Sequence, residues 1–171
     1  MAIISSFNIL GDTQARVLIL GSMPSVQSLT KQQYYAHPRN AFWKIMAALF
    51  NDYTPLGYGQ GQQVLQARGV VIWDVLKSCQ RQGSLDSAIE KDSMQMNDFN
   101  VFFAEHPSVI QVYFNGGTAE SLYKKHIWPV LAEQYKSLAY TRLPSTSPAY
   151  AAMSYQKKLA AWTVLQKVIN Q

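Results

Sequence analysis

Hydrophobic residues along the chain form two kinds of pattern, and the first is a set of short, almost continuous apolar runs. These runs cover residues 16–20, 69–73, 109–114 and, most weakly, 138–141. Continuous apolar runs are typical of strands that are covered on both faces, whereas a strand with one wet face alternates apolar and polar residues. We therefore predict four buried strands that pair in parallel.

The second pattern has the period of an α-helix. Its clearest example is one apolar stripe with the spacing i, i+3, i+4, i+7 and i+8, made by Phe42, Ile45, Met46, Leu49 and Phe50. Further helices are expected around 64–67 with an end at Gly69, from Asp98 to His106-Pro107, from a Thr118 cap to a break at Pro129, and over 159–169.

Strands that alternate with helices predict an α/β fold, here a three-layer α/β/α sandwich on a four-stranded parallel sheet. The length of 171 residues fits a single domain over 1–171. In such a sheet the carboxyl ends of the strands lie on one rim, where ligands bind. The segments expected there are polar or rich in Gly and Pro: Gly21–Ser25, Tyr35–Asn40, Asp74, Asn115–Thr118 and Leu143–Pro148.

Residues Tyr34–Trp43 combine two aromatic residues, a His-Pro pair, an Arg and an Asn directly before the first long helix. An aromatic face can stack on a nucleobase, Arg39 can hold a phosphate, and the Asn40 amide can position a water. The alternative is a surface turn whose aromatic residues pack into the core. Four other polar segments are expected on the same rim, and this convergence gives the binding-site interpretation of Tyr35–Asn40 the same weight as the surface turn.

Composition sets limits on the class of protein. Hydrophobic residues make up 48% of the chain and charged residues 15%, which indicates a globular protein. There is no apolar run of the ~20 residues that a membrane helix needs, no signal-peptide pattern, and one cysteine, Cys79, so no internal disulfide. These features fit a cytoplasmic protein. The net charge of +5 is compatible with an anionic partner such as nucleic acid.

Several kinds of chemistry lack their sequence signatures. The chain has no Gly-x-x-x-x-Gly-Lys phosphate loop, no Gly-x-Gly-x-x-Gly after a strand and no Gly-x-Ser-x-Gly elbow that would make Ser22 a nucleophile. The three histidines, His37, His106 and His126, do not have the spacing of metal ligands. The segment 115–118 is either an anion site at a helix start or an ordinary turn between a strand and a helix.

Three motifs resemble the uracil-DNA glycosylase superfamily, and most closely its hypoxanthine-DNA (deoxyinosine) glycosylase branch. They are Gly21-Ser22-Met23-Pro24, Tyr35 to Trp43 with its His-Pro-Arg-Asn core, and Leu143-Pro144-Ser145-Thr146-Ser147-Pro148. Their order and their places after the strands match over about residues 16–162. The resemblance implies a monofunctional DNA glycosylase that needs no metal or other cofactor and takes part in base excision repair. We expect DNA with a deaminated or mispaired base as its partner, and a monomer.

The resemblance also implies roles for particular residues. Asn40 matches the catalytic Asn of the branch, and the base-binding positions are Tyr35, Ser22, Met23, Asp74 and Asn115. The positions expected to contact DNA are Arg39, Ser145, Thr146, Ser147, Pro148 and Tyr150. The chain departs from the pattern at Ser25, where relatives often have Gly, and at Tyr150, where the branch is expected to have Asn.

Several of these roles have a simpler alternative. Asp74 can be a cap or turn residue, Arg39 can form a surface salt bridge, and Tyr35 can be a core residue. The named residues do not separate hypoxanthine from uracil, because both bases carry an N–H beside a carbonyl. The rivals are therefore a uracil- or mismatch-specific glycosylase, a DNA-binding relative with weak catalysis, and an unrelated flavodoxin-like module.

Overall fold

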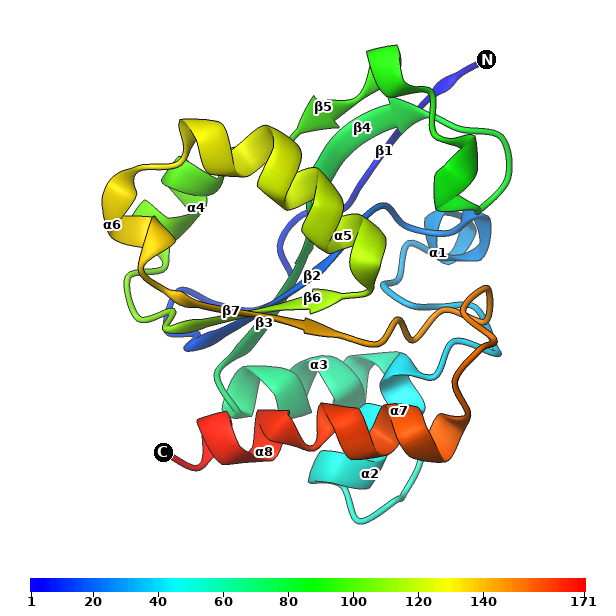
Figure 1. Cartoon of the computed structure of the whole chain (residues 1–171). Helices are drawn as coiled ribbons and strands as arrows, with labels where there is room; N and C mark the ends of the chain where they lie inside the picture. Colours follow the sequence, from blue (N-terminus) through cyan, green and yellow to red (C-terminus); the bar gives the residue numbers. More distant parts are fainter.

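A computed structural model describes residues 1–171 and places a four-stranded parallel sheet at the centre (Figure 1). Its strands are β2 (Val17–Gly21), β3 (Val70–Asp74), β6 (Gln111–Asn115) and β7 (Ala139–Leu143), in the spatial order β3-β2-β6-β7. The register aligns Val17 with both Val70 and Gln111, so the carboxyl ends of the strands meet at one rim. The predicted fold class and all four predicted strands are confirmed.

The side chains of β2 show why the sequence there is apolar throughout. All five of its residues are buried. Leu18 and Leu20 belong to one core cluster, whereas Val17 and Ile19 belong to a second cluster on the other face of the sheet. Successive side chains of a strand point to opposite faces, so a strand between two helical layers needs an apolar residue at every position.

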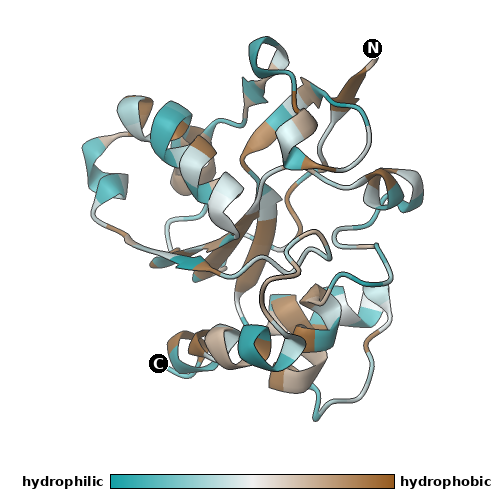
Figure 2. Cartoon of the chain, turned by 45° about the vertical axis from the view of Figure 1, so that its right-hand side comes forward, coloured by the Kyte–Doolittle hydropathy of each residue, from teal (hydrophilic) through white to brown (hydrophobic).

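Helices cover both faces of the sheet, which gives the three layers seen in Figures 1 and 2. One layer contains α2 (Phe42–Phe50), α3 (Tyr58–Ala67), α7 (Tyr155–Trp162) and α8 (Val164–Ile169). The other contains α4 (Phe99–Glu105), α5 (Gly117–Leu122) with a π-helical turn at Tyr123–Ile127 and a 3₁₀ turn at Trp128–Val130, and α6 (Glu133–Lys136). None of the helices has both the length and the apolar character needed to cross a bilayer.

Two helix predictions need correction, and one helix was missed. Thr118 does not cap α5, because the helix is capped two residues earlier by Gly116, whose φ of 97° favours glycine. The expected last helix over 159–169 begins at Tyr155 and is divided at Thr163 into α7 and α8. The short helix α1 (Val26–Lys31) was not predicted; Ser25 caps it by accepting a hydrogen bond from the Ser28 backbone N–H at 3.1 Å.

A second, antiparallel sheet was also missed. It consists of β1 (Ile3–Ser5), β4 (Leu76–Gln80) and β5 (Gln95–Met96), in the order β1-β4-β5. After β4 the chain forms two 3₁₀ turns, η1 (Asp86–Ala88) and η2 (Lys91–Ser93). Because β4 follows β3 after a single residue, this sheet begins at the rim and brings η1 close to it.

Candidate active site

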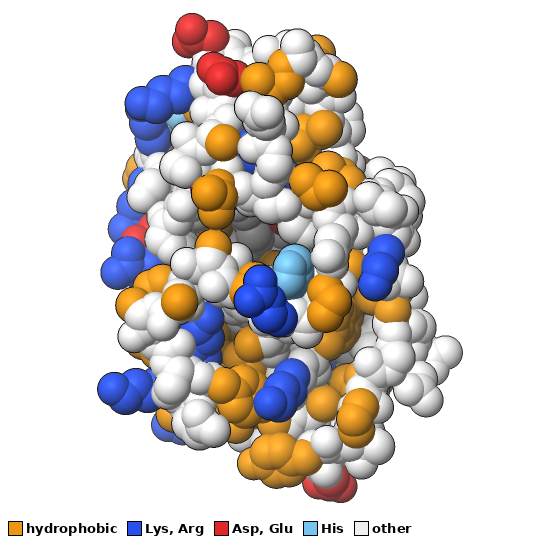
Figure 3. All heavy atoms as spheres, turned by 90° about the vertical axis from the view of Figure 1, so that its right-hand side faces the viewer, with side chains coloured by type: hydrophobic (Ala, Val, Ile, Leu, Met, Phe, Trp, Pro, Cys, Tyr) orange, Lys and Arg blue, Asp and Glu red, His pale blue; other side chains and the backbone are white.

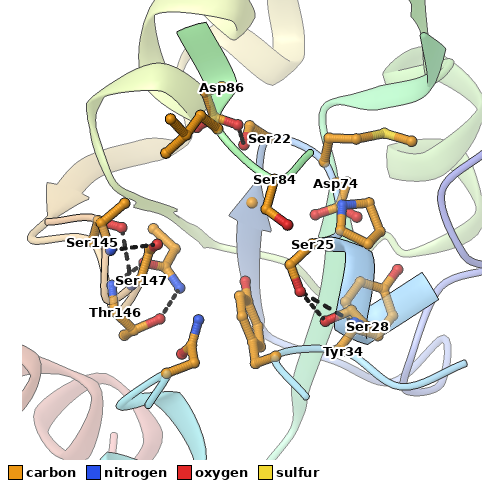
Figure 4. A pocket seen from close by; sticks show the side chains of 18 residues that line it. Ser22, Ser25, Ser28, Tyr34, Asp74, Ser84, Asp86, Ser145, Thr146 and Ser147 are labelled. Carbon is orange, nitrogen blue, oxygen red and sulfur yellow. Dashed lines mark hydrogen bonds between the residues drawn. The ribbon is translucent and has the colours of Figure 1, made fainter. Parts of the chain in front are cut away.

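A cavity opens at the rim where β2, β3 and β6 end (Figures 3 and 4). Its volume is about 120 Å³, below the range of about 300–1,000 Å³ common for drug-sized ligands. All five polar segments expected at the rim contribute to its wall: Ser22, Met23, Tyr35, Asn40, Asp74, Asn115, Ser145, Thr146 and Ser147 are among the lining residues. The predicted convergence of these segments is therefore present in the structure.

Asn40 lies on the cavity wall just before α2. Its Oδ1 accepts a hydrogen bond from the Phe42 N–H at 2.9 Å, which fixes the amide plane. The next residue, Ala41, donates its N–H to the Thr146 carbonyl at 2.9 Å and so ties this turn to the loop after β7. The Nδ2 group makes no hydrogen bond within the protein and is not buried. The amide is thus held rigidly and keeps donor capacity for a molecule in the cavity.

Tyr35 is both a wall residue and a packing residue. Its ring stacks on Phe42 at a centroid separation of 4.1 Å, and its backbone has a φ of 54°, in the left-handed region that side chains rarely adopt. Its hydroxyl is buried and has no hydrogen-bond partner. Burial and the nearby Asp74 carboxyl raise the pKa of this hydroxyl. A buried, unpaired hydroxyl beside a cavity can be satisfied by a polar group that enters it.

Asp74, at the end of β3, is only 3% exposed. Its Oδ2 accepts a hydrogen bond from the Ser6 hydroxyl at 2.6 Å, and its Oδ1 faces Gly21, where a Cβ atom would lie 2.6 Å away. Burial raises the pKa of this carboxyl to about 7; the Ser6 hydrogen bond opposes the rise and the charge of Asp86 adds to it. Asp74 caps no helix, and its buried carboxyl holds a proton more readily than an ordinary Asp does.

A second carboxylate in the cavity wall, Asp86, was not predicted. It accepts a hydrogen bond from the Ser22 hydroxyl at 2.8 Å (Figure 4). Burial raises the pKa of Asp86, while Ser22 and the Arg81 guanidinium partly offset the rise. Arg81 is 5% exposed and donates to the carbonyls of Pro24 and Gly83. Asp86 lies outside the five rim segments, in a turn that only the unpredicted strand β4 brings to the site.

Asn115 holds the loop that follows β7. Its Nδ2 donates to the Thr146 hydroxyl and its Oδ1 accepts the Thr146 N–H, both at 2.9 Å. Both ends of the amide are therefore engaged with Thr146, which is almost fully buried. The visible role of Asn115 is to fix the loop, and contact with a base stays a prediction.

Three predicted DNA-contact residues lie outside the cavity wall. Arg39 is exposed and forms no ion pair, so the salt-bridge alternative has no partner in the structure. Pro148 does not reach the cavity. Tyr150 lines a neighbouring groove and is 38% exposed. No group of three or more His, Cys, Asp or Glu side chains is arranged to hold a metal ion.

Comparison with known proteins links this site to a family. The family model described as "Uracil DNA glycosylase superfamily" matches residues 9–166. Two proteins named hypoxanthine DNA glycosylase are similar to this chain. The protein from Methanosarcina barkeri is 33% identical over 61% of this chain and 66% of its own length. The protein from Methanosarcina acetivorans is 36% identical over 63% of this chain and 68% of its own length. The match thus spans just under two thirds of the first relative's length. A solution NMR structure of a candidate uracil DNA glycosylase from Methanosarcina acetivorans superposes with a TM-score of 0.75 at 30% identity, over 96% of this chain and 99% of that one.

Proposed function

The chain belongs to the uracil DNA glycosylase superfamily, and from this premise we propose that it is a monofunctional DNA glycosylase of base excision repair. Its proposed substrate is DNA that contains a deaminated base, with hypoxanthine first and uracil second. The enzyme extrudes the base from the helix and hydrolyses its N-glycosidic bond. The names of the two similar hypoxanthine DNA glycosylases support this choice of base.

The observation that carries the proposal is the position of Asn40. An amide whose Oδ1 is fixed by the Phe42 N–H stands on the wall of a cavity of about 120 Å³ at the rim. Glycosidic bonds break through an oxocarbenium-like sugar, which is reactive enough to need only a well-placed water. A neutral Asn40 can place that water without acting as a base. No step requires a metal or another cofactor.

The cavity also offers groups that can bind the extruded base. Tyr35 supplies an aromatic wall, and Asp74 directs Oδ1 into the cavity region beside Gly21. As a carboxylate, Asp74 accepts from N1–H of hypoxanthine or N3–H of uracil; as a neutral acid, it donates to the adjacent carbonyl. Extrusion costs a few kcal/mol, and less for a mispaired base, so weak pairing contributes to selection.

Residues around the cavity are suited to the rest of the substrate. The backbone N–H groups of the segment Gly21–Ser25, which are missing only at Pro24, can stabilise the departing anionic base. Arg39 and the loop from Ser145 to Pro148 are proposed to contact the DNA backbone. Figure 3 shows Lys and Arg side chains around the hollowed face, with acidic side chains mostly at its two ends, as expected for a surface that receives phosphates.

The test is base release from a panel of duplexes that hold inosine, uracil, a thymine mispair or xanthine, detected as alkali-labile abasic sites. Inosine duplexes are expected to react fastest, and Asn40→Ala to abolish release. Asn51→Ala, at the other end of α2, is the matched control and should retain activity. Full activity in Asn40→Ala would refute the catalytic role of Asn40. DNA binding without any abasic product in the natural protein would favour a non-catalytic relative, and fastest release of uracil would favour the rival specificity.

A further inference from the structure

A larger groove adjoins the base cavity. It runs between the η1 and η2 turns on one side and α5 with the following π-helical turn on the other, and its volume is about 690 Å³. Five residues line both spaces: Leu85, Asp86, Ser145, Ser147 and Ala149. Since they share this wall, a polymer with one unit in the cavity can continue directly into the groove.

The groove has a positive charge that the protein does not neutralise. Lys91, Lys125 and Arg142 line it, and Asp86 is the one acidic residue among the lining side chains. Asp86 already accepts the Ser22 hydroxyl, and Arg142 lies 3.7 Å from Glu120. Lys91 and Lys125 are exposed and form no ion pair. Two ammonium groups therefore remain available for an anionic ligand.

Two exposed apolar side chains line the groove near the cavity: Leu85, which lines both spaces, and Tyr150, which follows the shared residue Ala149. Leu85 is 56% exposed and Tyr150 is 38% exposed. The Lys158 ammonium lies 5.3 Å from the centre of the Tyr150 ring, which restrains the ring on one side. The loop that bears Leu85 is also fixed, because the neighbouring Ser84 hydroxyl accepts the Val26 N–H at 2.9 Å. Cations combined with an aromatic platform are typical of surfaces that bind unpaired nucleotides.

We propose that this groove binds the nucleotides that follow the extruded base on one side of the DNA strand. Lys91 and Lys125 contact successive phosphates, and Tyr150 packs against the neighbouring base or sugar. The space that shares Tyr35 and Asn40 with the cavity has a single Lys, Lys44, whose ammonium already lies 4.1 Å from the Tyr155 ring centre. Arg39, between Pro38 and Asn40, adds one unpaired cation on that side, against two in the groove, so the grip on the strand is asymmetric. This inference rests on the proposed function.

The first test measures binding of a fluorescein-labelled duplex that contains a tetrahydrofuran abasic analogue, by anisotropy, from about 50 to about 200 mM salt. A Lys91→Gln/Lys125→Gln variant should bind roughly tenfold more weakly and lower the slope of log K against log salt by about two, because each lost phosphate contact removes about 0.9. Lys167→Gln, on α8 away from the rim, is the control and should change neither value.

The second test shortens the labelled strand to one nucleotide beyond the analogue, on the 5′ side or on the 3′ side. The natural protein should lose affinity mainly for one of the two truncations, and the double variant should lose that difference. An unchanged salt slope in the double variant, an equal effect of Lys167→Gln, or equal losses on both sides would overturn the proposal. These failures leave base release by the natural protein intact, whereas absence of base release would overturn the proposed function itself.

Discussion

Replacing Asp74 by Asn is expected to make the protein more stable above neutral pH and less active. The buried carboxyl has its pKa raised from 3.8 to about 7, chiefly by burial. A group with a raised pKa binds its proton more tightly in the folded state, so its contribution to stability is present at low pH. That contribution is lost as the pH rises from the unfolded pKa to the folded one.

The size of the effect follows from the size of the shift. A displacement of about three pKa units corresponds to about 4 kcal/mol, because each unit is worth about 1.4 kcal/mol. Asp74 is 3% exposed, so solvent screening reduces this value little. Asn has nearly the same shape and carries no charge. The Asp74→Asn variant should therefore have a free energy of unfolding that is higher by up to this amount at pH 8 and almost unchanged at pH 4.

Urea denaturation of both proteins between pH 4 and pH 8 measures the difference directly. Asp52→Asn, at an exposed position, serves as the control and should run parallel to the natural protein. Asp74→Asn should release the base from inosine duplexes more slowly although its fold is more stable, because the Asn side chain cannot ionise to a carboxylate. A variant that is no more stable at pH 8, or one that keeps its advantage at pH 4, would refute the assignment of a desolvated carboxyl.

Two further changes test how the cavity is built. Gly21→Ala should lower the rate of base release at least tenfold, because the new Cβ would lie 2.6 Å from Asp74 Oδ1 and 3.3 Å from the Tyr35 hydroxyl; Gly59→Ala, with open space around its Cβ, should have no effect on the rate. Asn115→Ala removes two hydrogen bonds to Thr146 and should cost about 1–3 kcal/mol of unfolding free energy, measured by urea denaturation, and weaken DNA binding as the loop loosens. If the Asn115→Ala variant had the same stability and the same affinity for DNA as the unsubstituted protein, the loop would be held by other contacts.

The sequence predicted the central sheet because burial on both faces leaves an unmistakable pattern. In β2 every residue is apolar or Gly and every residue is buried. The carboxyl ends of such strands must share a rim, so the convergence of Tyr35, Asn40 and Asp74 followed from topology and needed no side-chain detail. Asp98 likewise caps α4 as expected, accepting the Val101 N–H at 3.1 Å.

The features that were missed depend on contacts between distant parts of the chain. β4 has polar residues at buried positions, such as Ser78, so its sequence has no clean strand period. In the sequence, Asp86 and Arg81 look like ordinary surface charges in a Gly- and Ser-containing turn. Only the tertiary structure shows that Arg81 is buried and that Asp86 lines the cavity. The start of α5 at Gly116 likewise depends on a distant segment, since the Gly116 N–H donates to the Leu143 carbonyl and a Cβ there would lie 2.9 Å from the Ser145 Cβ.

The hydrogen bond between Ser6 and Asp74 spans 68 residues, and the pair formed by Asn115 and Thr146 spans 31. During synthesis, the chain can therefore form the Ser6–Asp74 hydrogen bond long before Thr146 is available to pair with Asn115. The strand order adds to the delay, because β2 is made first among the four parallel strands but pairs with β6, which is made third. Such long-range pairing slows folding. A nascent chain that stops before β6 would display one bare apolar edge of β2, which makes early arrest a route to aggregation.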